Sequence, residues 1–212
     1  MSIPVVHVVD DDDQMRIALT RLLRAEGYEV RPYESAGHFL LSPPEDGPGC
    51  VVLDLQMPGP SGLDLQQALQ QRQMNLPIVF LTGRGDIASS VRAMKAGAVD
   101  FLTKPVEPQT LLKAIDAALA RDRSARASRE QVKHAEAHYA SLTDRERTVF
   151  DQVVAGKLNK QIGGALGISE RTVKMHRAQV MAKMKVASIA ELVHSAELLR
   201  SAGVAPHSAR ED

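Results

Sequence analysis

This sequence of 212 residues contains little cysteine, and it has neither a long apolar run nor a segment that resembles a signal peptide at its start. The one cysteine, Cys50, cannot form an internal disulfide, and it lies in a run that we expect to be a core strand. No apolar run reaches the roughly 18 residues that a membrane-spanning helix needs. The segment 1–4 lacks the basic and apolar regions of a signal peptide. These absences exclude a disulfide scaffold and indicate a protein of the reducing cytoplasm.

Charge is present in equal numbers of both signs, but it is unevenly distributed along the chain. Residues 1–120 contain ten Lys and Arg against fifteen Asp and Glu, a net charge of −5. Residues 142–200 contain ten against six, a net charge of +4. An acidic half joined to a basic half indicates separate roles, and a basic domain suits a polyanion. An ordinary solvated surface would fit the charge of the second half equally well.

Five apolar runs rich in β-branched residues alternate with stretches of helical periodicity in the first half of the chain. Parallel strands need crossover connections, so this alternation predicts a parallel sheet with helices on both faces. We therefore expect a flavodoxin-like α/β domain of five βα units over residues 1–120. The predicted strands are 4–9, 28–31, 50–54, 77–81 and 99–103.

Polar side chains lie at the ends of four of these strands, and in such sheets ligands bind beyond the carboxyl ends. They are Asp10, Asp11, Asp54, Thr82 and Lys104. Clustered carboxylates offer the oxygen ligands that Mg²⁺ prefers. We expect Asp54 to act as a nucleophile that forms an acyl phosphate, with Lys104 and the Thr82 hydroxyl contacting the phosphoryl oxygens.

The same residues have structural alternatives when each is considered alone. Asp12 is expected to be the N-cap of the first helix, and Asp13 a first-turn acid that the helix dipole favours. Thr82 alone is more often a turn residue, and Lys104 alone a solvated charge. A calcium EF-hand is excluded, because Met15 stands where that loop requires glycine. The ordered conjunction of these residues favours the phosphoryl site.

The second half of the chain has only helical periodicity. Residues 121–141 are predicted to be a helical linker, with a disordered tether as the alternative. Residues 142–200 predict four helices, with the N-caps Thr143, Asn159, Ser169 and Ser188. In the first half of the chain, Asp86 is the expected N-cap of the helix that follows the strand 77–81. A short helix, a glycine-containing turn and a longer helix predict a helix-turn-helix domain. Residues 201–212 lack apolar periodicity and are expected to form a flexible tail.

The longer helix of this domain carries basic residues at a spacing of three. Arg171, Lys174 and Arg177 therefore share a face, from which cations can reach base edges and phosphates in a major groove. A solvated cationic face is the alternative interpretation of the same spacing.

The first half of the chain resembles a known family, the receiver domains of two-component response regulators. The motifs that carry the resemblance are Val9-Asp10-Asp11, Leu53-Asp54-Leu55-Gln56-Met57-Pro58, Leu81-Thr82-Gly83, the segment 96–101 and Lys104-Pro105. The resemblance implies that a histidine kinase phosphorylates Asp54. It implies Mg²⁺ held by Asp11, Asp54 and the backbone carbonyl of Gln56, with Asp10 acting through water. It also implies a cis Lys104–Pro105 bond, with Thr82 and Phe101 coupling phosphorylation to a changed surface.

The second half resembles the LuxR-type DNA-binding domain. The resemblance rests on segments 142–147, 159–162, 166–169 and 172–176, with Gly156 and Lys183-Met184. It implies DNA contacts by Lys160, Arg171, Thr172, Lys174, His176 and Arg177. Gly163-Gly164 departs from the family pattern, in which Ala is more usual at the first position, and we expect a less stable helix there. Together the halves are similar to regulators of the NarL/FixJ class.

We therefore predict a transcription regulator whose binding to promoter DNA depends on phosphorylation and on Mg²⁺. The expected partners are a sensor kinase, RNA polymerase and a second copy of the chain, with Val91, Lys95 and the fifth strand as the pairing face by resemblance only. The alternatives are an Asp-nucleophile phosphohydrolase, a phosphorylation-independent regulator and an RNA-binding protein. The absence of a general acid argues against the first, and the absence of a stacking aromatic near the basic helix against the last. We expect a phosphoacceptor, with autodephosphorylation allowed, and not a turnover enzyme.

Overall fold

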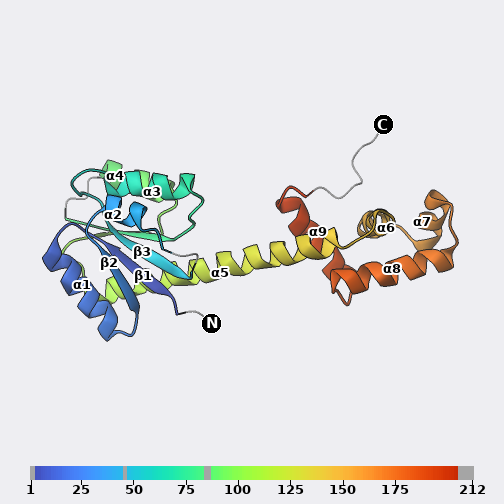
Figure 1. The fold of residues 1–212 in the computed structure, drawn as a ribbon, viewed down its shortest axis with the longest axis horizontal. Coiled ribbons are helices and arrows are strands. Elements are labelled where there is room, and N and C mark those ends of the chain that lie inside the picture. Colours follow the sequence, from blue (N-terminus) through green and yellow to red (C-terminus); the bar gives the residue numbers. More distant parts are fainter. Residues whose placement is uncertain (1–2, 45–46, 84–86, 205–212) are drawn as a thin grey trace. The chain divides into compact units, whose positions relative to one another are not determined.

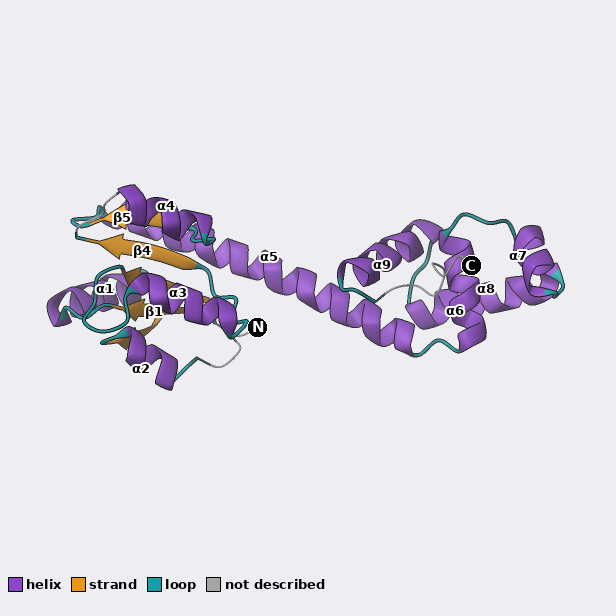
Figure 2. Ribbon diagram, turned by 90° about the horizontal axis from the view of Figure 1, so that it is seen from above, coloured by secondary structure: helices purple, strands orange, loops and turns teal. Residues whose placement is uncertain are grey.

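The computed structural model describes residues 3–44, 47–83 and 87–204 of the chain. The chain divides into two compact units, Met1–Ala125 and Arg126–Asp212. In its described residues the first unit alternates strands and helices, whereas the second contains helices and loops (Figures 1 and 2). The division falls inside the segment 121–141 that the sequence marks as a linker.

A parallel sheet of five strands, in the order β2-β1-β3-β4-β5, forms the centre of the first unit. Val9 of β1 lies opposite Tyr33 of β2 and Leu53 of β3, and Asp54 lies opposite Leu81 of β4. The carboxyl ends of the strands therefore meet at one rim of the sheet, and the predicted flavodoxin-like fold is confirmed. The strands are β1 Val5–Val9, β2 Glu29–Tyr33, β3 Gly49–Asp54, β4 Ile78–Thr82 and β5 Asp100–Thr103.

Helices cover both faces of this sheet (Figure 1). One face packs against α1 and α5 through residues such as Leu23 and Ile115, and the other packs against α2, α3 and α4 through residues such as Phe39 and Leu65. Each face thus buries its own apolar core, which explains the continuous apolar strands. The helices are α1 Asp13–Ala25, α2 Ala36–Leu41, α3 Gly62–Gln71, α4 Ile87–Lys95 and α5 Pro108–Ala140.

Side-chain caps fix where the helices of the first unit begin. The Asp12 carboxylate accepts hydrogen bonds from the backbone N–H groups of Gln14 and Met15, so its predicted capping role is confirmed. Ser61 caps α3 in a capping box with Asp64. Asp86, the expected cap of α4, lies outside the described residues.

Helix α5 continues without interruption through residues 121–140, the segment for which a helix was expected. Within the first unit, the Asp122 side chain on this helix is only 1% exposed and accepts a hydrogen bond from the Gly49 N–H at the start of β3, at 3.0 Å. A buried carboxylate is tolerated only when it is hydrogen-bonded. Asp122 therefore attaches α5 to the strand whose other end carries Asp54.

The second unit packs four further helices around a core that includes Ala135 and Tyr139 of α5. Thr143 and Glu146 form the predicted capping box, and Ser169 and Ser188 cap the helices that follow them. The three inward residues expected on the long helix, Val173, Val180 and Met184, are buried. The helices are α6 Asp144–Val154, α7 Asn159–Leu166, α8 Glu170–Met184 and α9 Ile189–Ser201.

One predicted cap is wrong. Asn159 is the first residue of α7, and the N-cap is Leu158, whose side chain has no acceptor. The Gln161 side chain instead accepts a hydrogen bond from the Leu158 N–H at 2.8 Å, which supplies half of a capping box. The Asn159 side chain is thereby available for another contact.

Among the residues that the model describes, no helix is both long enough and apolar enough to cross a membrane. Helix α9 ends at Ser201, and residues 205–212 of the predicted tail lie outside the described residues.

Candidate functional site

Three carboxylates converge at the rim of the sheet. Asp10 and Asp11 follow β1, and Asp54 ends β3, so the parallel register of these neighbouring strands brings them together. One ligand atom from each lies within 4.8 Å of the others. Asp10 and Asp54 are buried, at 2% and 7% exposure, whereas Asp11 is exposed. The sequence therefore predicted this cluster correctly.

Lys104 lies against the cluster from the end of β5. Its Nζ donates a hydrogen bond to Asp10 Oδ2 at 2.8 Å and lies 3.4 Å from Asp54 Oδ1. Burial lowers the pKa of the Lys104 ammonium, but the hydrogen bond and charge of Asp10, with the charge of Asp54, outweigh this and raise the pKa above its ordinary value. Lys104 is therefore held in its charged form beside the two buried acids.

The Asp54 carboxyl has a raised pKa. Burial is the largest cause, and the neighbouring charge of Asp10 adds to it, while Lys104 opposes it. The Asp54 anion is thus incompletely compensated by the protein's own groups, and an additional cation at the rim would stabilise it.

A hard divalent cation fits this donor set. Asp54 Oδ1 is buried and accepts no hydrogen bond from any residue that the model describes. The three carboxylates supply only oxygen ligands, which suits Mg²⁺. The backbone carbonyl of Gln56, which the family resemblance adds to the ligands, belongs to an exposed residue that follows β3 by two positions. The residues present therefore fit the predicted metal.

The two predicted coupling residues lie on β4, which neighbours the strand of Asp54, and on β5, one strand further from it. Thr82 is completely buried at the end of β4, where its carbonyl accepts a hydrogen bond from the Lys104 N–H at 2.7 Å. Phe101 of β5 is partly exposed, and its ring centroid lies 6.0 Å from that of Phe80. The Lys104–Pro105 peptide bond is cis, as the resemblance implied.

Two residues that support the rim were not identified from the sequence. Arg16 Nη1 donates to the Asp10 carbonyl at 2.7 Å, and the same guanidinium pairs with Asp13. Gly62 packs against β3 so closely that a Cβ atom would lie 2.3 Å from the Asp54 carbonyl oxygen. The Asp13–Arg16 spacing of three is a readable signal. The need for glycine at 62 depends on tertiary packing and leaves no local signal.

The six residues expected to contact DNA lie on α7 and α8 of the second unit. Lys160, Arg171 and Lys174 are exposed, so their charges are available to a ligand. Thr172 is partly buried, with its Oγ1 2.9 Å from the Ser169 Oγ at the helix start. His176 is partly buried, and its Nδ1 lacks a hydrogen-bond partner among the described residues.

Arg177, the sixth of these residues, has an internal partner. Its Nη1 donates to Asn159 Oδ1 at 2.7 Å, which connects α8 to the first turn of α7. Asn159, which does not cap α7, therefore positions Arg177. Arg177 lies on the predicted basic face, but its guanidinium also holds the two helices of the helix-turn-helix together.

A second ion pair connects α8 to α6. Lys183 Nζ lies 2.6 Å from Glu146 Oε2, and the Glu146 side chain is only 5% exposed. Hydrogen bonds from Lys183 and from Thr143, with the Lys183 charge, hold the pKa of the Glu146 carboxyl below its ordinary value despite its burial. This contact fixes the far end of α8 against the start of α6.

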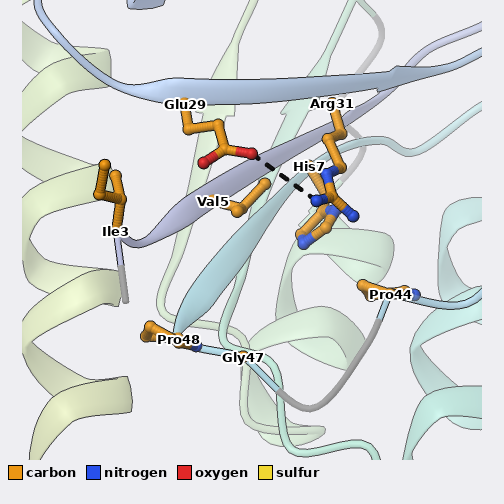
Figure 3. Close-up of a pocket in the computed structure, with 8 residues that line it drawn as sticks. All are labelled: Ile3, Val5, His7, Glu29, Arg31, Pro44, Gly47 and Pro48. Carbon is orange, nitrogen blue, oxygen red and sulfur yellow. Dashed lines mark ion pairs between the residues drawn. The ribbon is translucent and has the colours of Figure 1, made fainter. Parts of the chain in front are cut away.

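A separate cavity of about 280 Å³ lies in the first unit, at the amino ends of β1 and β2 (Figure 3). Val5, His7, Glu29 and Arg31 contribute to its lining, and Glu29 and Arg31 form an ion pair at 3.7 Å. Burial, with the Arg31 charge, lowers the pKa of His7 to about 4, so its imidazole is neutral at pH 7. The cavity is at the opposite end of these strands from Asp10 and is not part of the acid cluster.

Comparison with known proteins matches both units to families. Residues 6–116 match the response regulator receiver domain, and residues 140–196 match the bacterial regulatory proteins of the luxR family. Nodulation protein W of Bradyrhizobium diazoefficiens is 45% identical, over 92% of this chain and 86% of its own. FixJ, a transcriptional regulatory protein of Azorhizobium caulinodans, is 44% identical over 97% of this chain and 95% of its own.

A solved structure with similarity along most of the chain is that of the response regulator StyR. It is 47% identical, covers 92% of this chain and 99% of its own, and superposes with a TM-score of 0.83.

Proposed function

The chain belongs to the two-component response regulators of the NarL/FixJ class, with a receiver domain followed by a LuxR-type DNA-binding domain, and we propose that phosphorylation of Asp54 controls its binding to promoter DNA. A sensor histidine kinase supplies the phosphoryl group. The observation that carries the proposal is the rim, where the buried Asp54 lies beside Asp10, Asp11 and Lys104 in a chain that also has a DNA-binding domain.

The chemistry at Asp54 is the transfer of a phosphoryl group from a phosphohistidine. A carboxylate oxygen attacks the phosphorus, the P–N bond breaks, and the imidazole leaves with a proton while an acyl phosphate forms. Asp11, Asp54 and the Gln56 carbonyl would hold Mg²⁺, with Asp10 acting through water; bound Mg²⁺ supplies charge neutralisation. Lys104 pairs with the new phosphoryl oxygens, since its ammonium already lies 3.4 Å from Asp54.

The phosphorylated rim changes the surface on which two copies pair. Thr82 and Phe101 respond to the added charge, and Val91 and Lys95 belong to the pairing face. Val91 is 44% exposed on α4, and Ile87 and Met94 of the same helix are also exposed apolar residues. Exposed apolar side chains on one short helix support a protein-binding surface there. A dimer would then place two DNA-binding domains on two half-sites.

The DNA-binding surface consists of the exposed basic residues of α7 and α8. Lys160, Arg171 and Lys174 contact phosphates or base edges, and Thr172, His176 and Arg177 complete the surface. Arg177 additionally keeps α8 on α7 through Asn159. Binding to promoter DNA places the protein in the cytoplasm, with RNA polymerase as the next partner.

The test is the DNA affinity of wild type and Asp54→Ala, with and without acetyl phosphate and Mg²⁺. Wild type is expected to dimerise and to bind promoter DNA more tightly after treatment, and Asp54→Ala is expected not to respond. Glu26→Gln, which changes an exposed carboxylate at the end of α1, should respond like wild type. An Asp54→Ala protein that responds like wild type would refute the switch. Repeated turnover of small phosphate esters would refute the phosphoacceptor role.

A further inference from the structure

Two histidines lie one turn apart near the end of α5. The rings of His134 and His138 stack, with centroids 6.4 Å apart and an interplanar angle of 27°. A spacing of four residues puts side chains on the same face of a helix. Two imidazoles with this spacing are the arrangement by which a helix chelates a metal ion, as in the paired histidines of zinc enzymes.

These imidazoles have no other polar contact in the part of the chain that the model describes. Neither ring forms a hydrogen bond or an ion pair there, and His134 is exposed. Three other histidines have polar neighbours, because His7 contacts the Tyr33 hydroxyl, His38 lies near Glu34 and His194 lies near Glu197. Ala135 and Tyr139 anchor the same turns in the core of the second unit, so packing does not require the two histidines.

The position on the helix also favours a cation. His138 lies in the last turn of α5, the end at which the aligned peptide dipoles of a helix favour positive charge. One cation already binds there, because Arg147 Nη2 donates to the Ala140 carbonyl at 3.3 Å. The neighbouring Lys133 is paired with Glu130 at 3.2 Å.

We propose that His134 and His138 form a binding site for a divalent transition-metal ion that prefers imidazole ligands, with Zn²⁺ as the occupant. Each ring supplies one neutral nitrogen, and water completes the coordination shell. Imidazole pairs select Zn²⁺, Cu²⁺ and Ni²⁺ over Mg²⁺, which prefers oxygen ligands. The site is therefore chemically distinct from the acid cluster at Asp54, and it does not depend on the proposed phosphorylation.

Bound metal would bridge one turn of α5 where this helix joins the second unit. A ligand that binds only the folded helix stabilises it by an amount that grows with the logarithm of its concentration relative to its dissociation constant. We therefore expect Zn²⁺ to protect the backbone amides of residues 134–138 from hydrogen exchange.

The experiment titrates the untagged full-length protein with ZnCl₂ by calorimetry, in excess Mg²⁺ to occupy the acid cluster. His134→Gln/His138→Gln is compared with wild type and with His38→Gln/His194→Gln, a control that removes two exposed histidines elsewhere. Wild type and control should bind one Zn²⁺ with the same affinity. The double variant should bind at least about tenfold more weakly, and each single variant should also lose affinity.

A second readout identifies the ligand atoms. With Cu²⁺ as the probe, electron paramagnetic resonance should show two coordinated nitrogens in wild type and control, and this signature should be absent from the double variant. Circular dichroism verifies that the variants retain their helices. Zn²⁺ affinity within twofold of wild type in a folded double variant, or a Cu²⁺ spectrum with oxygen ligands alone in wild type, would overturn the proposal.

Discussion

At the scale of single residues, the two adjacent glycines of α7 have opposite environments. Gly163 is buried, and a Cβ atom there would lie 2.8 Å from the Ile168 carbonyl oxygen, a backbone atom that cannot move freely. Gly164 is exposed, and a Cβ atom there would meet nothing within 4 Å. The cost of a glycine within the helix is therefore offset by close packing at Gly163, whereas nothing offsets it at Gly164.

Gly164→Ala is expected to stabilise the second unit by about 0.5–1 kcal/mol, because alanine restricts the unfolded chain and fits the helix. Gly163→Ala is its matched control and should give no gain or a loss, since the Ile168 backbone would have to shift. Urea unfolding, followed by NMR signals of the α6 and α8 amides, measures both variants. Equal stabilisation by the two substitutions would contradict this account of the packing.

Residue identities alone were sufficient to predict the rim but not the contacts that position it. Asp10, Asp11, Asp54, Thr82 and Lys104 each lie at or just after the end of an apolar strand, and parallel strands bring such positions to one edge. By contrast, Asn159 had the sequence signature of a cap, and its true role as the partner of Arg177 depends on a contact 18 residues away. Capping propensity depends on neighbouring residues in the sequence, whereas the partner of a side chain in the folded protein depends on how the helices pack.

At the scale of helices and strands, the element boundaries were predictable wherever a capping side chain marks the start. Thr143, Ser169 and Ser188 all accept hydrogen bonds from the first turns of their helices. The buried Gln66 of α3 was not predictable, although its Nε2 donates to the carbonyls of Ala93 and Ala96 at 3.2 Å and so holds the end of α4. A lone glutamine in a helix carries no signal of such a contact.

The ion pair between Glu146 of α6 and Lys183 of α8 is expected to stabilise the second unit. Lys183→Met is expected to destabilise the second unit by about 2 kcal/mol, because it leaves the Glu146 carboxylate buried without its cation. The loss should be smaller than the roughly 3–5 kcal/mol of a fully buried pair, since the Lys183 side chain is 37% exposed. Lys157→Met, which removes an exposed lysine, should change the stability little.

The pH dependence of stability separates this ion pair from simple packing. The folded state lowers the pKa of Glu146 below its ordinary value near 4.5, so the folded state binds fewer protons than the unfolded state there. The resulting stabilisation is present above that value and is lost as pH falls through the folded pKa. Wild type should therefore lose stability on acidification in this window, and Lys183→Met should lose less. Parallel pH curves for the two proteins would refute the assignment.

At the scale of the whole molecule, the charge asymmetry of the sequence corresponds to two units with separate cores. Among the described residues, none of those in the second unit's core belongs to either core of the first unit. Each unit also has its own polar network, one around Asp54 and one around Glu146. Helix α5 contributes to the cores of both units, through Ile115 in the first and Tyr139 in the second.

Separate cores predict that fragments 1–125 and 126–212 each fold when expressed alone. The second fragment should bind promoter DNA with an affinity that acetyl phosphate and Mg²⁺ do not change. In the full chain the same treatment should change the affinity by roughly 5–150-fold, the usual range of coupling between two sites. Amide NMR spectra that match those of the intact chain would establish folding, and fluorescence anisotropy would measure DNA binding.

The salt dependence of binding tests whether Lys174 contacts a DNA phosphate. Lys174→Ala in the second fragment should lower the slope of log affinity against log salt by about 1, because one phosphate contact is lost. For the fragments themselves, failure of either 1–125 or 126–212 to fold alone would refute the independence of the two cores. A folded fragment whose DNA affinity still responds to acetyl phosphate would instead place the regulated site outside the first unit, because Asp54 and its partners are absent from that fragment.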